Sequence, residues 1–372
     1  MEALIKAIQK TPIIDHHAHN LLLPSEIATH PLMSITTEAN GPALNYASST
    51  LAHMRAVRQL SEILECEPSW ESVQSRIEEE RKQPDDLWAR KCFQGIETVL
   101  VDDGLDGEIV HPYDWHNRLT RSKCKRIARV EKVAEEILAL ALMSHHSGSS
   151  AEFLAMVTDS FTTNIQRAID DPEVVGFKSV ICYRTGLAIP DFAGLDPRAA
   201  VDTLLKQRPA GFTRLEEGTL SPYFVHLAAQ ALARSASASQ PPKPFQFHTG
   251  LGDNDITLRL SSASHLQPFI KSYPSVPIVL LHASYPYTKD AGYLASTYEN
   301  VYMDIGEVFP MISQEGQEHV IREALEFCPT EKLTWSTDGH WFPETYLLAV
   351  MQVREAMELV GPPLISGGFP DT

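Results

Sequence analysis

Short apolar runs alternate along the chain with longer segments of helical periodicity. The runs are rich in β-branched and aromatic residues, and eight stand out: residues 12–15, 95–101, 124–130, 174–183, 245–248, 276–282, 301–305 and 333–336. Runs such as VPIVLL are apolar on both faces, which is typical of parallel strands that are covered on both sides. The pattern therefore predicts eight strands in a parallel sheet.

Helical patterns lie between most of these runs, for example VEKVAEEILALALM and PETYLLAVMQVREAMELV. Strands and helices that alternate in this number predict the α/β class and a (β/α)8 TIM barrel. An open doubly wound sheet has the same local pattern and is the alternative. Because barrels of this kind reach such lengths as one unit, we expect residues 1–372 to form a single domain.

One connection is too long for a simple barrel. Residues 24–92 form an insertion between the first two predicted strands, with helical patterns at 49–65 and 70–82. Long insertions in barrels serve as lids over the active site or pack on the side and support dimers, and the sequence favours neither. The tail, residues 361–372, follows the last helical pattern and is expected to be loose.

Composition narrows the function classes. The chain has 31 basic and 48 acidic residues, a net charge of −17, and 43% hydrophobic residues. This composition excludes wholesale disorder and argues against nucleic-acid and anionic-membrane partners, which need a basic face. The five cysteines include no CxxC pair, and no membrane span or secretory signal is evident. We expect a cytoplasmic protein, a homodimer by default, that acts on a small molecule.

Histidines and an aspartate follow the predicted strands. His17 and His19 are two apart after the first run, so that on an extended strand end both side chains point to the same side. His248, His282 and Asp338 end the fifth, sixth and eighth runs. The carboxyl ends of barrel strands form the catalytic face, and nitrogen and carboxylate ligands without cysteine suit zinc first, with manganese or iron as alternatives. The pattern predicts a divalent metal centre that activates water.

Longer motifs make the sequence similar to a known family. The HxH pattern followed by Lys, His, His and Asp on strands four, five, six and eight resembles the amidohydrolase superfamily. The segments VGFKSVICYRTGL, FHTGLGDNDI and STDGHWFPET resemble the N-terminal amidohydrolase domain of FluG-type proteins, in which a glutamine-synthetase-like domain follows. The resemblance covers nearly the whole chain, and we expect either a stand-alone homologue or an isolated portion.

The resemblance implies roles for the strand-end residues. His17, His19 and Asp338 are expected to bind the first metal, with His248 as a further ligand and His282 orienting the attacked group or the water. In two-metal relatives, a carbamylated lysine at the position of Lys178 bridges the ions, and His248 and His282 hold the second metal. We favour one ion, and two if Lys178 is carbamylated. Asp338 is the expected general base, because a carboxylate beside the metal can accept a proton from water.

Side chains in the strand-end loops are candidates for substrate binding. Arg184 is suited to a two-point contact with a carboxylate, Asp253 could hold an amine, and Trp341 could shape the pocket. His16 faces away from its neighbours on an extended strand and is expected in a supporting role, not as a ligand. Together these residues suit an amino-acid-like substrate.

Three functions compete. The leading hypothesis is a metal-dependent hydrolase of a C–N bond, with a γ-glutamyl amide as the attractive substrate because of the partner domain in FluG-type proteins. The second is a metal-dependent nonoxidative decarboxylase, an activity that the related amidohydrolases include. The third is a non-catalytic scaffold with a structural metal, which so many candidate ligands at one barrel mouth argue against.

Overall fold

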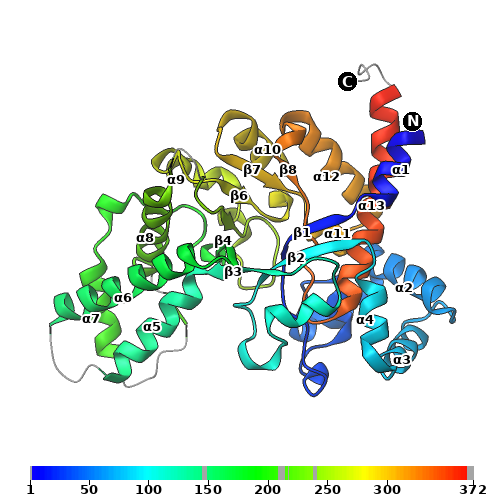
Figure 1. The fold of residues 1–372 in the computed structure, drawn as a ribbon, viewed down its shortest axis with the longest axis horizontal. Helices are drawn as coiled ribbons and strands as arrows, with labels where there is room; N and C mark the ends of the chain where they lie inside the picture. Colours follow the sequence, from blue (N-terminus) through cyan, green and yellow to red (C-terminus); the bar gives the residue numbers. More distant parts are fainter. Residues whose placement is uncertain (1, 145–148, 208–213, 217, 238–240, 367–372) are drawn as a thin grey trace. The chain divides into compact units, whose positions relative to one another are not determined.

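A computed structural model describes residues 2–144, 149–207, 214–216, 218–237 and 241–366 (Figure 1). The chain divides into two compact units. The first unit comprises residues 1–125, 252–254 and 304–372, and the second unit comprises residues 126–251 and 255–303. Each unit is described by itself below.

All eight predicted strands are present in the described part of the chain, where they form one sheet in chain order from first to last. Their bounds are β1 (Ile13–Ala18), β2 (Ile96–Asp102), β3 (Lys125–Arg129), β4 (Val174–Ser179), β5 (Phe245–Phe247), β6 (Ile278–Leu280), β7 (Val301–Asp304) and β8 (Leu333–Thr334). β1 pairs with β2 in parallel in the first unit, and β3 to β7 pair successively in parallel in the second. The predicted (β/α)8 class is confirmed, because a doubly wound sheet would not keep the strands in chain order.

The helices also follow the predicted pattern. The first unit contains α1 (Glu2–Lys10), α2 (Leu51–Leu64), α3 (Trp70–Glu80), α4 (Leu87–Cys92), α11 (Val308–Met311), α12 (Gln314–Phe327) and α13 (Pro343–Ser366). The second contains α5 (Val130–Ser144), α6 (Ser150–Asp170), α7 (Pro197–Gln207), α8 (Leu220–Ser235), α9 (Gln267–Ser272) and α10 (Thr288–Thr297). Among the described helices, none combines the length and the apolarity that crossing a bilayer requires.

The insertion between β1 and β2 packs against α13. Leu60 of α2 and Ile77 of α3 are fully buried in an apolar cluster that includes Tyr346 of α13. The polar edge of α2 is tied to the same helix, because the Arg55 guanidinium donates to the Glu355 carboxylate at 2.6 Å. The helices α2 and α3 of the insertion are therefore held against α13 by both apolar and charged contacts.

The expectation of a loose tail from residue 361 is wrong for residues 361–366, which continue α13. The reason is tertiary packing, since α1 lies against this end of α13 and a Cβ on Gly361 would be 3.4 Å from the Leu4 side chain. The Arg354 guanidinium of α13 also donates to the Ile8 carbonyl at the end of α1. Residues 367–372 lie outside the described part of the chain.

Candidate metal centre

Three of the predicted ligands converge in the first unit. The Nε2 atoms of His17 and His19 lie 3.2 Å and 3.4 Å from the Oδ1 atom of Asp338, and the two imidazole rings stand 5.1 Å apart. Both histidines are buried. Ligands placed about 2.0–2.1 Å from a tetrahedral zinc ion lie about 3.3 Å from one another, so this spacing fits a single divalent ion. His17, in β1, and His19, just after it, therefore both present Nε2 to the Asp338 carboxylate.

His19 is fixed in the tautomer that a ligand needs. Its Nδ1 lies 2.9 Å from the carbonyl oxygen of Asp102, and because a carbonyl only accepts, this nitrogen carries the proton. Nε2 is then left with a lone pair on the side of Asp338. The backbone of His19 is held as well, since the Tyr346 hydroxyl donates to its carbonyl at 2.5 Å and its N–H donates to the Gly339 carbonyl at 2.7 Å.

A buried aspartate at the end of β2 adds to this group. The Asp102 side chain is fully buried, its Oδ2 lies 3.9 Å from Nδ1 of His19, and its carboxylate is close enough to His17 and His19 to be a ligand atom itself. The sequence analysis missed this residue. The signal was present, because Asp102 directly follows the predicted strand at 95–101 and the same strand-end rule would have found it.

The loop that carries Asp338 is anchored from below. The Thr337 N–H and hydroxyl donate to the two carboxylate oxygens of Asp15 at 2.9 Å and 2.5 Å, and the Gly339 N–H donates to the Thr337 hydroxyl at 2.8 Å. Asp338 itself has a left-handed φ of 51°. Complete burial raises the pKa of Asp15 to about 7. The buried Asp15 carboxyl group therefore holds the residue that precedes the predicted ligand Asp338.

The insertion contributes an acid that the sequence analysis also missed. Burial, together with the negative charges of Asp338 and Asp253, raises the pKa of Glu38 to about 8. The predicted residue Asp253 thus lies within electrostatic reach of this group in the first unit. No sequence pattern marked Glu38, because it sits in an irregular segment whose path depends on the packing of the insertion.

His16 and Trp341 lie beside the centre in supporting contacts. Nε2 of His16 is 3.0 Å from an Asp304 carboxylate oxygen, which agrees with the prediction that it is not a ligand. The Trp341 ring stacks on His30 with centroids 3.7 Å apart, and its indole N–H donates to Asp106. Trp341 is thereby held as a rigid wall by partners on both sides.

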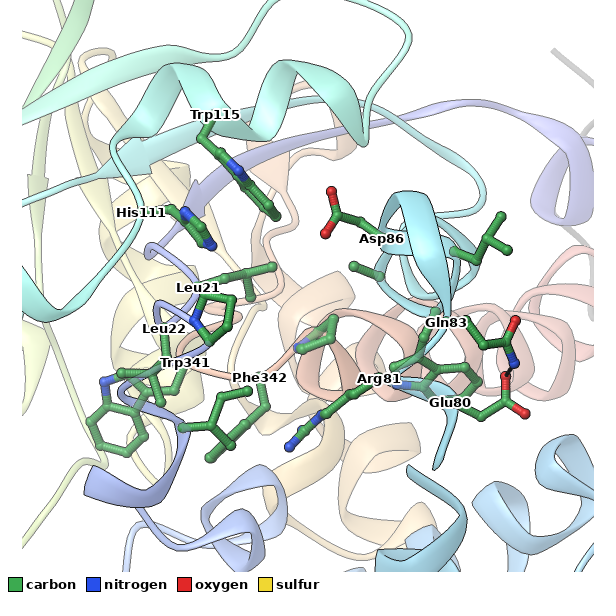
Figure 2. A pocket seen from close by; sticks show the side chains of 16 residues that line it. Leu21, Leu22, Glu80, Arg81, Gln83, Asp86, His111, Trp115, Trp341 and Phe342 are labelled. Atoms are coloured by element: carbon green, nitrogen blue, oxygen red, sulfur yellow. Dashed lines mark hydrogen bonds between the residues drawn. The ribbon is translucent and has the colours of Figure 1, made fainter. Parts of the chain in front are cut away.

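A pocket of about 110 Å³ adjoins Trp341 in the first unit. Figure 2 shows His111 and Trp115 together on one side of it and Trp341 on another. The rings of His111 and Trp115 stack at 3.8 Å, which gives the pocket flat aromatic walls. Charged side chains, among them Arg81 and Asp86, line the pocket as well.

In the second unit, two further predicted ligands lie together. The His248 and His282 rings have centroids 4.4 Å apart, and the Tyr183 ring lies 4.5 Å from His248. Gly250 allows this approach, since its φ is +77° and a Cβ there would be 2.4 Å from the Ser284 backbone. The loops after β5 and β6 therefore pack backbone to backbone, and each carries one histidine.

Lys178 lies near the end of β4, where its side chain is 1% exposed. The Glu131 carboxylate accepts from the Ser179 hydroxyl at 2.6 Å and from the Val180 N–H at 3.0 Å, and burial raises its pKa. Glu131 thus anchors the turn after β4, next to the lysine.

Arg184 follows the same strand and already faces a carboxylate of the chain. Its Nη2 lies 3.4 Å from Oε1 of Glu135, which also accepts from the Leu215 N–H at 2.9 Å. Burial lowers the pKa of Arg184, and the positive charge of Arg214 lowers it further. The Arg184 Nε is buried without an acceptor among the described residues, so the guanidinium keeps a donor to offer.

Sequence comparison connects these residues to known proteins. The Amidohydrolase family model matches residues 243–360, which carry His248, His282 and Asp338. Protein fluG of Emericella nidulans is 43% identical over 377 residues, covering 97% of this chain and 43% of that protein. The chain therefore spans less than half the length of this relative.

Structure comparison gives the same fold. A protein of Lactobacillus casei classed as a metal-dependent hydrolase is 25% identical with a TM-score of 0.80, covering 99% of this chain and 92% of that one. A uronate isomerase of Bacillus halodurans is 13% identical with a TM-score of 0.66, covering 100% of this chain and 90% of that one, and so shares the fold alone. The resemblance predicted from the sequence motifs is confirmed.

Proposed function

Because this chain belongs to the amidohydrolase superfamily, we propose that it is a metal-dependent hydrolase that cleaves the C–N bond of an amide. The observation that carries the proposal is the group formed by His17, His19 and Asp338, whose spacing fits one divalent ion. We propose zinc as that ion, with manganese or iron as alternatives. When bound, such an ion supplies a Lewis acid that polarises a carbonyl and lowers the pKa of water.

In the one-ion case that we favour, the proposed ligand set extends the first-unit group by His248; a second ion would be held by His248 and His282. This extension rests on their positions after β5 and β6 and on family membership. One ion per chain is the expectation, and Lys178 is uncarbamylated in that case. Metal analysis of the purified chain should give one equivalent, and two equivalents with a carbamate on Lys178 would reject the one-ion proposal.

Asp338 is the proposed general base. Its carboxylate accepts the proton of the attacking water and passes it to the departing amine, which requires hydrogen-bond reach to both. The anchoring of its loop through Thr337 and Asp15 supports this role, because a base must be held in a fixed place. His282 is proposed to orient the attacked carbonyl.

For the substrate we propose a γ-glutamyl amide or a similar amino-acid-like amide. Arg184 is proposed to bind its carboxylate, since one guanidinium nitrogen is buried without an acceptor among the described residues. Asp253 is proposed to hold the amine, and Trp341 to line the pocket. The Glu135 contact does not exclude this role, because a 3.4 Å ion pair leaves other donors of the guanidinium available.

The test is amine release from a panel of γ-glutamyl amides by the zinc-, manganese- or iron-loaded chain. We expect turnover by the wild type and a loss of about 10²–10⁴ in kcat for Asp338→Asn, with the fold retained. Asp114→Asn, an exposed residue of the first unit, is the matched control and should keep full turnover. Release of carbon dioxide without amine would reject the hydrolase proposal in favour of a decarboxylase. A fully active Asp338→Asn variant would reject the role of Asp338 as general base.

A further inference from the structure

A second, larger cavity lies in the first unit away from the predicted ligands. Its volume is about 690 Å³, and its walls come from α1, α12, α13 and the start of β8. The wall residues are mostly apolar and include Leu4, Ile8, Ile321, Leu325, Trp335 and Met357. Ligand cavities in proteins have volumes of about 300–1,000 Å³ and mostly apolar walls, so this cavity has the size and lining of a small-molecule site.

The cavity is separate from the candidate metal centre. Its lining along the segment of β8 ends at Trp335, directly after the strand, whereas Asp338 comes three residues further along the chain. None of the predicted ligands lines it. A molecule bound here would therefore act beside the proposed reaction and not in it.

The packing of α1 over this cavity is partial. α1 turns Leu4 and Ile8 toward it, yet none of the residues of α1 is fully buried. The Trp335 indole nitrogen is buried and has no acceptor among the described residues, although buried donors are nearly always paired. The apolar side chains of α1 thus line the cavity without being closely packed, which leaves them available to an apolar ligand.

One wall carries a cation that is loosely held. Arg322 lines the cavity and its side chain is 42% exposed. The ion pair of its guanidinium with Glu318 on the same helix spans 3.8 Å. That distance is too long for a good charge-assisted hydrogen bond, so the guanidinium can turn to another anion at little cost. Glu326 lies on the same wall but interacts with another group of the chain.

We propose that this cavity binds an amphipathic monocarboxylate, with its apolar chain or ring between α1, α12 and α13 and its carboxylate at Arg322. The apolar walls provide most of the affinity through burial of the ligand body, and Arg322 selects the anionic end.

The test is calorimetric titration of the full chain with straight-chain carboxylates from hexanoate to dodecanoate. We expect saturable 1:1 binding whose affinity rises about fourfold per added CH₂ until the cavity is full. Met357→Trp replaces a flexible side chain by a bulky indole ring that fills part of the cavity, and it should weaken decanoate binding at least tenfold. Leu359→Trp lies two residues away on the same helix, is 46% exposed and does not line the cavity, so it should bind as the wild type does.

Arg322→Gln examines the head group. It should weaken decanoate several-fold and leave decanol unchanged, and circular dichroism should show that the fold is kept in all three variants. Absence of saturable binding, or equal weakening by Met357→Trp and Leu359→Trp, would overturn the proposal. A third outcome would also overturn it: the chain self-associates with rising concentration, Met357→Trp abolishes this self-association, and decanoate does not bind. The occupant of the cavity would then be a second copy of the chain.

Discussion

Replacing Tyr346 by Phe removes a single hydroxyl that connects α13 to the predicted ligand His19. Tyr346 is fully buried, and its hydroxyl donates to the His19 carbonyl at 2.5 Å. Burial raises the pKa of Tyr346 well above its usual range, so the hydroxyl keeps its proton and stays a donor. The variant leaves a buried carbonyl without this donor, which costs about 1–3 kcal/mol of unfolding free energy.

The same change should loosen His19 as a ligand. Among the described residues, the hydrogen bonds left to His19 would then be the one from its N–H to the Gly339 carbonyl and the one from its ring to the Asp102 carbonyl. Partners that orient metal ligands change metal affinity by about 10–100-fold when they bond the ligand directly. Because Tyr346 acts one step further away, on the backbone, we expect about a tenfold weaker affinity for zinc.

Two assays separate the effects on metal affinity and on stability. Competition with a chromophoric chelator measures the zinc affinity, and urea unfolding of the metal-free protein measures the unfolding free energy. Tyr273→Phe is the matched control, since Tyr273 is also buried and its hydroxyl lies 2.7 Å from Nδ1 of His226, which is not a predicted ligand. It should lose similar stability and keep its zinc affinity. If Tyr346→Phe also kept wild-type zinc affinity, the hydroxyl would be purely structural and the reasoning refuted.

Three further predictions follow from the same structure. Gly250→Ala should lower the unfolding free energy, measured by urea titration, by at least about 2 kcal/mol, because alanine is strained at φ +77° and its Cβ would lie 2.4 Å from the Ser284 backbone. Gly194→Ala is the control and should leave the unfolding free energy unchanged, since a Cβ there meets nothing within 4 Å. Burial lowers the pKa of His116 from 6.5 to about 4, so the unfolded chain binds a proton between these values that the folded chain does not. Stability should therefore fall by about 3 kcal/mol as the pH drops through this window, and His116→Gln should lose that part of the pH dependence. Thorough chelation should abolish amine release and lower the melting temperature, and zinc should restore both; full turnover after chelation would contradict a metal-dependent reaction.

Much of the fold could be predicted from local sequence patterns. The apolar runs are short and rich in β-branched residues, and each is followed by a polar strand end, so all eight strands could be located before the structure was known. The pair His17 and His19 could be predicted for the same reason, since a spacing of two along a strand end places side chains on one side. The family resemblance added what spacing alone cannot supply, namely the expected roles of Lys178 and His282.

What the sequence left open depends on contacts between distant segments. Glu38 lies in an irregular part of the insertion, about 300 residues before Asp338 in the sequence, and the tertiary structure brings the two within electrostatic reach. The last turns of α13 form despite two prolines because α1 lies against them, a contact that no local propensity encodes. Local periodicity determines which segments become strands and helices. The tertiary structure alone decides the burial of side chains, the pKa values and the cavities, because these depend on side chains hundreds of residues apart.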